Sequence, residues 1–347
     1  MLKVERYEDC LAELQAKKRT LNLMLGNGFS MAYDAKIFSY NALQTFIAEL
    51  KDPILDKLFA VVKSKNLEVI MQQLRVLSQL LEVFGAPATL KKKVAATDLA
   101  LRQGLINAVK GLHPEHVFEI PEPQIAACAR FLAPYLAGTG SVFTANYDFL
   151  LYWVLMRGRI PNANDGFGRE LLNPEEPNPQ NHDYAPELTW GPNVPGQNIH
   201  YLHGALHLFD DGIEIEKEAY DGFNYLLHCV EERMKNEDYP VFVTAGSGDD
   251  KLAQIAHNKY LEHCYRKLCS LEGSLVVFGF NFGPYDEHII EALNIAAKHG
   301  RNAGEKLFSI YIGAYTPDDA KHISSIADKV RCKVRLFDSS KVNPWGK

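Results

Sequence analysis

A glycine-rich turn near the N-terminus has the composition of a phosphate-binding loop. Residues 21–30 read LNLMLGNGFS, an apolar run that ends in glycines and a hydroxyl residue. The candidate binding residues of this turn are Gly26, Asn27, Gly28, Phe29 and Ser30. A buried strand that enters such a turn leaves bare backbone N–H groups, which can approach a phosphate. Because Met31 stands where a full GxGxxG has its third glycine, the turn alone is weak support for a nucleotide site.

Three later segments repeat this pattern of an apolar run followed by polar residues. They read SVFTANYD, NIHYLHG and SLVVFGFNFG. The residues that they bring are Thr144, Asn146, Asp148, His203, Gly204, Gly279 and Asn281, with Asp286 and His288 just beyond the last segment. In open parallel sheets, ligands bind outside the carboxyl ends of the strands. We therefore expect these residues to lie together with the glycine turn.

Each of these segments, taken alone, has a simpler structural explanation. Asn146 and Asp148 can cap the helix that follows them. His203 can be a hydrogen-bonded histidine of a turn, and Asp286 and His288 occupy a first helical turn, where Asp is favourable to the helix dipole. Capping explains four such segments at four strand ends less easily than it explains one.

A metal site is the weaker interpretation of the neighbouring histidines His200, His203 and His207. Two histidines of an HxxxH pair must share one helical face to bind a metal. Gly204, at a strand-to-loop transition, argues against a helix there, and residues three apart in a strand point to opposite faces. We therefore expect no metal in this protein.

Strands and helices alternate along the chain. Candidate strands, apolar and rich in β-branched or aromatic residues, are 20–26, 141–145, 198–202, 241–245, 274–280, 307–313 and 332–337. Helical patterns cover 39–50, 54–84, 95–111, 122–137, 148–157, 219–236, 249–271, 284–299 and 317–329. This alternation predicts an α/β fold with a Rossmann-like, doubly wound and mainly parallel sheet.

Two long connections interrupt this alternation within a predicted single domain, 1–347. About a hundred residues separate the first two strands, whereas a crossover needs only a dozen or so, so we predict a helical insertion at 35–138. The segment 157–198 is rich in Pro and Asn, and loops of this length are usually functional lids or disordered linkers. Because candidate site segments adjoin both of its ends, we expect a lid loop there.

Composition narrows the class of protein. The chain has 347 residues, 47% of them hydrophobic, and a net charge of -6, which gives no electrostatic footprint for nucleic acid. Its compact basic run, Lys91 to Lys93, is typical of a solvated helix face. The six cysteines form no CxxC pair, so neither a zinc ribbon nor a disulfide framework is indicated.

The sequence gives no sign of export or of a membrane. The first residues, MLKVERYEDC, lack the apolar core of a signal peptide, and the lipid-like stretch FLLYWVLM at 149–156 is too short to span a bilayer. We therefore expect a cytoplasmic protein that contacts neither membrane nor nucleic acid directly.

The segments GNGFS, TANYD, LHG and GFNFGPYDEHI together resemble the NAD-binding motifs of sirtuins, and they occur in the family's order over residues 21–290. The chain is most similar to short bacterial sirtuin-like proteins associated with phage defence. Within that group it resembles a sirtuin-related domain family first catalogued as of unknown function.

The sequence departs from the sirtuin deacylases in three places. Asn27 stands where they have Ala in GAG, and Ala145 stands where they have Gln in TQN. The region 205–272 lacks the spacing of their four-cysteine zinc module, because Cys264 and Cys269 are five residues apart. The peptide-binding cleft of a deacylase therefore has no visible support, which weakens protein deacylation or ADP-ribosylation as the activity.

The resemblance implies roles for three residues in cleaving the bond between nicotinamide and ribose in NAD+. Asn146 would hold the ribose or the attacking water, and Asp148 would support the nicotinamide pocket or the positive charge. His203 would contact the ribose hydroxyls or activate water, with a pKa suited to a base near neutrality. The other candidate residues would bind NAD+ itself: Gly26, Asn27, Gly28, Phe29, Ser30, Thr144, Gly279, Asn281, Asp286 and His288.

This chemistry needs a stabilised oxocarbenium-like centre and a positioned water. The sequence therefore predicts an NAD+ glycohydrolase that releases nicotinamide and ADP-ribose, acting in antiphage defence by NAD depletion. A homo-oligomer or a defence partner protein is expected with it. The alternative is a non-catalytic sensor that binds NAD+ or ADP-ribose and signals through assembly.

Overall fold

A seven-stranded sheet, parallel at every strand pair, forms the centre of the protein. The computed structural model describes residues 2–35, 53–62, 67–170, 187–219, 224–236, 238–241, 243, 247–298 and 306–347. The strand order is β1-β11-β10-β9-β2-β3-β6. Their bounds are β1 (Val4–Glu5), β2 (Leu21–Leu25), β3 (Val142–Thr144), β6 (Ile199–Tyr201), β9 (Gly273–Phe278), β10 (Leu307–Ala314) and β11 (Lys333–Asp338). The α/β fold with a parallel sheet is as predicted.

The central strands are buried along their whole length, as parallel strands covered on both faces must be. β2 and β9 expose none of their residues. The polar Asn22 is tolerated in β2 because its amide is fully engaged: Nδ2 donates to the carbonyls of Glu272 and Ser274, and Oδ1 accepts from the N–H of Ser141. Asn22 thereby ties together the starts of three neighbouring strands.

Twelve α-helices lie in the part of the chain that is described. They are α1 (Tyr7–Ala16), α2 (Asn27–Tyr33), α4 (Pro53–Val62), α5 (Leu67–Val83), α6 (Ala88–Leu112), α7 (Glu122–Leu136), α8 (Leu150–Arg157), α9 (Leu226–Lys235), α10 (Gly248–Ala256), α11 (Lys259–Cys269), α12 (Glu287–Lys298) and α13 (Pro317–Ala327). Short 3-10 helices occur at η1 (Val117–Glu119), η2 (Val194–Gly196) and η4 (Ser339–Lys341). Helices α12 and α13 pack on β10, α7 packs on β2, and α1 packs on β11.

Local capping explains where several helices begin. Ser247 and Thr316 form capping boxes with Asp250 and Asp319 at the starts of α10 and α13. The helix predicted over 249–271 is two helices, because the side chain of Asn258 accepts the N–H groups of Tyr260 and Leu261 and starts α11 anew. Sequence periodicity alone did not reveal this break.

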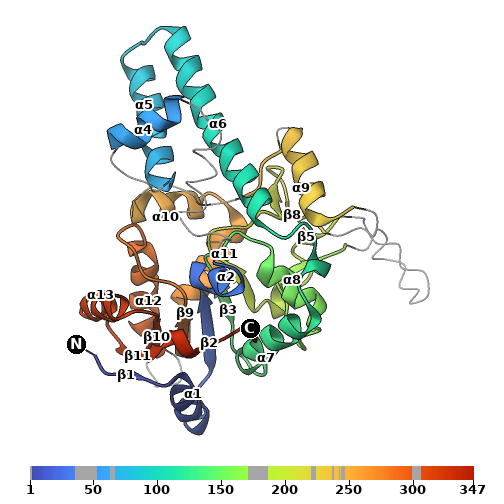
Figure 1. Ribbon diagram of the computed structural model, residues 1–347, viewed down its shortest axis with the longest axis vertical. Coiled ribbons are helices and arrows are strands. Elements are labelled where there is room, and N and C mark those ends of the chain that lie inside the picture. The colour runs from blue at the N-terminus through green and yellow to red at the C-terminus, as the bar shows by residue number, and fades with distance from the viewer. Residues whose placement is uncertain are drawn as a thin grey trace.

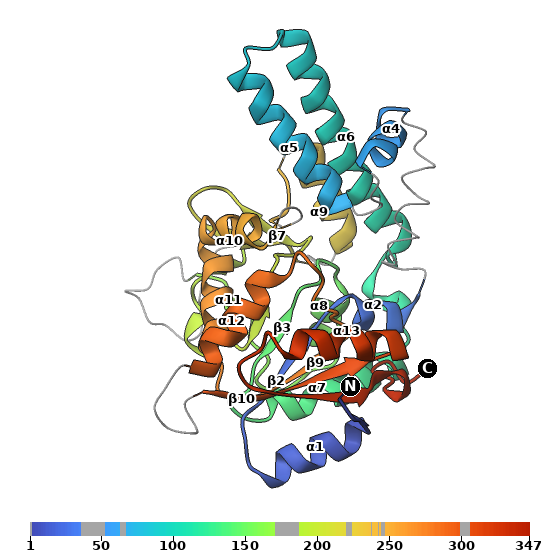
Figure 2. The same cartoon turned by 90° about the vertical axis from the view of Figure 1, so that its left-hand side faces the viewer.

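The described residues between β2 and β3 are mainly helical. Helices α5 and α6 form a hairpin that projects from the body of the protein, away from the sheet (Figures 1 and 2). The predicted helix at 39–50 lies outside the described residues. The assignment of 35–138 as a helical insertion within a single domain stays a prediction.

The segment predicted as a structureless lid, 157–198, contains two strands. They join a small antiparallel sheet of order β4-β5-β8-β7. Its strands are β4 (Phe167–Gly168), β5 (Thr189–Trp190), β7 (Leu208–Asp210) and β8 (Ile215–Lys217). The Asn residues that suggested a loop hold this segment together: Asn164 Nδ2 donates to the Asn193 carbonyl, and Asn193 Nδ2 donates to the Phe167 carbonyl. Residues 171–186 lie outside the described residues. The role of 157–198 as a lid stays a prediction.

One predicted strand, 241–245, is not a strand at its described residues, Val241 and Val243. Val243 bonds to the turn that follows β6, and Val241 bonds to the first residue of β7. The N–H of Val243 donates to the His203 carbonyl, and the N–H of Val241 donates to the Leu208 carbonyl. Gly204, which has φ +78°, turns the chain between these two contacts.

Candidate functional site

The glycine turn connects β2 to α2 and touches the loop that follows β9. The N–H of Gly26 donates to the Phe278 carbonyl at 3.0 Å, and the N–H of Gly28 donates to the Gly279 carbonyl at 2.9 Å. A Cβ atom on Gly28 would lie 2.6 Å from the Cα of Gly279. The glycines therefore allow two backbones to pack together, and two N–H groups expected to face a phosphate are bonded within the protein.

Phe29 and Asn27 have different positions on α2. Phe29 is buried, its carbonyl accepts the indole N–H of Trp345 at 2.9 Å, and the two rings lie 5.0 Å apart. Phe29 is thus an anchor of the helix rather than an accessible binding residue. Asn27, the first residue of α2, is half-buried, and its Nδ2 approaches the Met31 sulfur at 3.6 Å.

Asn146, Ser30 and Asp148 form a hydrogen-bonded chain where β2 and β3 end. The amide nitrogen Nδ2 of Asn146 donates to Ser30 Oγ at 3.0 Å and to the Gly26 carbonyl at 3.0 Å. Ser30 Oγ donates to Asp148 Oδ2 at 2.5 Å. Because both protons on Asn146 Nδ2 are used, its Oδ1 is the atom that the amide can offer to a ligand. Buried Thr144 fixes the loop, since its Oγ1 accepts the Asn146 N–H.

Asp148 is a buried carboxyl group with two partners. Oδ1 accepts the N–H of Leu150 at 2.9 Å in the first turn of α8, and Oδ2 accepts from Ser30. Asp148 thus supports α8, as the capping explanation requires, and also contacts the glycine turn. Burial raises its pKa from 3.8 to about 6, against the opposing effect of these hydrogen bonds.

His203 and His288 meet across the ends of β2 and β3. In the sheet, β6 and β9 flank this central pair of strands, His203 follows β6, and His288 lies in α12, which follows β9. Their Nε2 atoms lie 2.9 Å apart, so one neutral ring donates to the other. The structure therefore brings together two residues that the sequence only placed at the same edge of the sheet.

Both histidines are uncharged at neutral pH. Burial lowers the pKa of His203 well below 6.5, and it lowers the pKa of His288 to about 3, with the charge of Lys251 acting in the same direction. Nδ1 of His288 is buried and has no hydrogen-bond partner among the described residues. The expectation that His203 titrates near neutrality is therefore not met.

Asp286 and Asn281 lie in the loop between β9 and α12. Asp286 Oδ1 accepts from Lys251 Nζ at 3.3 Å, and Oδ2 accepts the N–H of Gly283, so this carboxylate secures the loop to α10. The Asn281 side chain is exposed, while its carbonyl contacts Nε2 of His322 at 2.9 Å. Asp286 thus supports the loop that carries His288.

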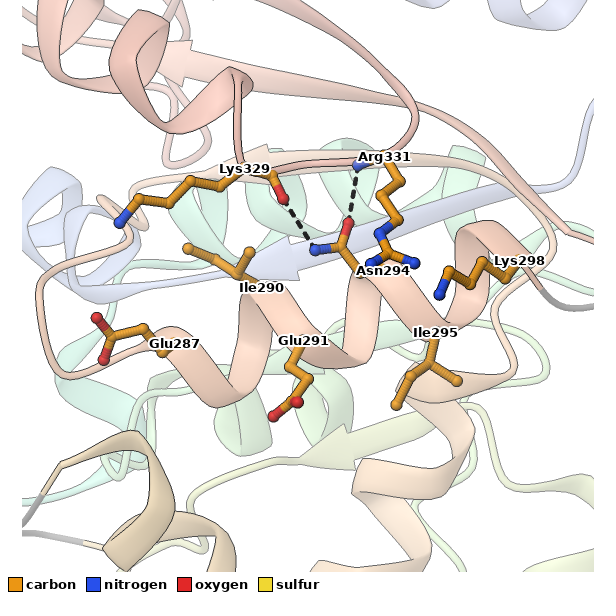
Figure 3. A pocket seen from close by; sticks show the side chains of 8 residues that line it. All are labelled: Glu287, Ile290, Glu291, Asn294, Ile295, Lys298, Lys329 and Arg331. Carbon is orange, nitrogen blue, oxygen red and sulfur yellow. Dashed lines mark hydrogen bonds between the residues drawn. The ribbon is translucent and has the colours of Figure 1, made fainter.

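A groove lies outside this cluster, on the outer face of α12 (Figure 3). It has a volume of about 440 Å³ and is lined from α12 and from the segment between α13 and β11. Asn294 spans its wall, donating to the Lys329 carbonyl and accepting the N–H of Arg331. The predicted site residues do not line this groove.

Comparison with protein-family models matches residues 23–345 to the domain of unknown function DUF4917. The chain belongs to this family. No curated protein matches it significantly. The matched region of this chain contains the glycine turn, the Asn146 chain and both site histidines, and the family's description states no activity.

Among its described residues, this DUF4917 protein has neither a metal-binding cluster nor a membrane-spanning helix. No group of three or more His, Cys, Asp or Glu residues there is arranged to hold a metal ion. No helix in that same part of the chain has the length and apolar character needed to cross a membrane.

Three residues that support the site were not recognised in the sequence. Lys251 is buried against Asp286, and Trp345 is fully buried against α2. His113 Nε2 accepts the N–H of Phe149, beside Asp148, and burial lowers the pKa of His113 to about 4. None of them lies in a motif, so only the tertiary fold relates them to the site.

Proposed function

We propose that this DUF4917 protein is an NAD+ glycohydrolase that releases nicotinamide and ADP-ribose, and that it acts in the bacterial cytoplasm in antiphage defence by depleting NAD. The proposal rests on the sirtuin-like motifs together with one structural observation. This observation is the chain of hydrogen bonds from Asn146 through Ser30 to Asp148, at the edge of the sheet where open α/β folds bind ligands.

The chemistry of the reaction fits these residues. In hydrolysis, the bond between ribose C1′ and the nicotinamide nitrogen breaks, neutral nicotinamide leaves, and water adds to C1′ with loss of a proton. The ribose carries positive charge in the transition state, and the carboxylate of Asp148, ionised above pH 6, is a buried negative charge suited to stabilise it. Asn146 would present Oδ1 to the ribose or to the attacking water.

Because both histidines are neutral, the pair is better suited to bind the ribose than to remove a proton from the attacking water. His203 and His288 have lowered pKa values and contact each other, so His203 in this arrangement would donate or accept a hydrogen bond with the ribose hydroxyls. Attack of water on ribose C1′ needs no strong base, because the nicotinamide leaving group of NAD+ is already cationic.

The same histidine pair favours a second candidate function, a sensor that binds NAD+ or ADP-ribose without cleaving it. Both histidines have pKa values lowered below the neutral range, so neither ring is suited to activate water at neutral pH. Such a sensor would signal through a homo-oligomer or a partner protein.

Nicotinamide release from NAD+ by the purified protein tests the proposal. We expect Asn146→Ala to reduce the rate at least 100-fold by removing the ribose contact. His257→Ala is the matched control, because this histidine is exposed at the end of α10. A rate equal to wild type in Asn146→Ala would refute the site, and tight NAD+ binding without turnover would favour the sensor.

A further inference from the structure

The α5–α6 hairpin is held together along one side of α5. Ile70 and Leu74 of α5 are buried, as are Val94 and Leu101 of α6. These four residues form the apolar contact between the two helices among the side chains that are described.

A second apolar row runs along α5 and is exposed. The row, here called the α5 stripe, consists of Val76, Leu77, Leu80 and Val83 of α5 and of Phe84 directly after it, which are exposed by 39% to 80%. At 100° per residue, these positions lie within about 60° on either side of Leu80. Scattered single exposed apolar residues are common, but a contiguous row of five on a projecting helix indicates a binding surface.

The α5 stripe is symmetric about Leu80. Val76 and Phe84 are four residues from Leu80 on either side, and Leu77 and Val83 are three residues from it. If two copies of α5 pack antiparallel with Leu80 against Leu80, Val76 therefore faces Phe84 of the other copy. Every apolar position of the stripe then meets an apolar position, as an isologous two-fold interface requires.

The charges on α5 are compatible with this self-contact. Arg75 and Glu82 are the charged residues between positions 70 and 84. They lie roughly 140° to 160° around the helix from Leu80, on the opposite side. Two copies can therefore pack through the stripe without bringing the like charges of α5 together, and without burying either of them.

We propose that the α5 stripe is a homodimer contact, with a second copy of this chain as its occupant and Leu80 on the two-fold axis. The stripe covers about two and a half turns of helix, so we expect a small contact of the weak, transient class rather than one of standard size. We expect a dissociation constant of about 10 to 100 µM. This contact does not depend on the proposed NAD+ hydrolysis.

Sedimentation velocity of the full chain over a concentration series tests the dimer. Wild type is expected to shift from monomer to dimer as concentration rises through the dissociation constant. Leu80→Glu is expected to raise that constant at least tenfold, because it places two carboxylates against each other at the axis. Ser78→Glu is the matched control: Ser78 is exposed on the opposite side of the same turn, so this variant should dimerise like wild type.

Cysteine cross-linking tests the register independently. After mild oxidation, Leu80→Cys is expected to give a disulfide dimer that neither Ser78→Cys nor wild type gives, which also controls for the native cysteines. A wild type that stays monomeric to 300 µM overturns the proposal, and would mean that another segment or another protein covers the stripe. Equal cross-linking of Leu80→Cys and Ser78→Cys overturns it as well. Thermal melting of each variant checks that it is folded.

Discussion

The two halves of the candidate site are built in different ways. Asn146, Ser30 and Asp148 follow two strands that are hydrogen-bonded neighbours, β2 and β3, and each side chain has at least two partners. His203 and His288 follow the flanking strands, β6 and β9, and a single hydrogen bond joins their rings. Several hydrogen bonds fix the geometry of the first half, whereas one hydrogen bond holds the second half together.

This difference suggests a division of labour. Preorganised polar groups stabilise a transition state best when they need no rearrangement, and the Asn146 chain meets that condition. A single bond between two neutral imidazoles contributes only about 1 kcal/mol, so a ligand can replace it at small cost. We therefore expect the histidine pair to adapt on ligand binding while the Asn146 chain stays in place.

Gly279→Ala should give the largest effect, because Gly279 links the two halves. A Cβ there would lie 2.6 Å from the Cα of Gly28, and the residue has φ +70°. The substitution should lower the free energy of unfolding by about 4 kcal/mol, measured by urea denaturation. Gly138→Ala is the control, since a Cβ on Gly138 meets nothing within 4 Å. Equal stability of the two variants would show that the loops do not pack as described.

Asp148→Asn tests the fixed half through the pH dependence of stability. The pKa of Asp148 is about 6 in the folded protein and 3.8 in the unfolded chain, so the native state binds more protons between these values. Its contribution to stability is complete below pH 3.8 and falls, by up to about 3 kcal/mol, as pH rises to 6. The difference between wild type and Asp148→Asn should therefore change over this window. Parallel pH profiles would contradict the burial of this carboxyl group.

A double-mutant cycle on His203→Ala and His288→Ala measures the weaker half. We expect a coupling energy of about 1 kcal/mol at pH 7. The pKa of His288 is about 3 when folded and 6.5 when unfolded, so its contribution is present above pH 6.5 and is lost as pH falls toward 3. His288→Ala should remove part of that acid sensitivity. Additive single effects would mean that the rings do not interact.

The fold could be predicted from the sequence to a large extent, because apolar runs mark buried parallel strands. Six of the seven predicted strands are present, from β2 to β11. The short strands of the second sheet could not be predicted, since two or three residues carry no periodic pattern. The two strands β4 and β5 were also missed because the Pro- and Asn-rich composition of 157–198 is typical of a loop.

The candidate site was predictable as a location but not as a set of contacts. The strand-end rule brought Ser30, Asn146 and Asp148 together in advance. It could not show that Gly26 and Gly28 pack against another loop, because glycine serves close packing and phosphate binding equally well. Nor could it pair His203 with His288, whose contact depends on the path of two loops.

The most direct test of the central claim is proton NMR of NAD+ mixed with the full chain, at protein concentrations below and above the expected dimer range. This single measurement reports both binding, through broadening of the NAD+ resonances, and cleavage, through the appearance of free nicotinamide. We predict free nicotinamide with wild type and with His257→Ala, and its loss with Asn146→Ala. NAD+ resonances that neither broaden nor convert with wild type would contradict an NAD+ site at this edge of the sheet.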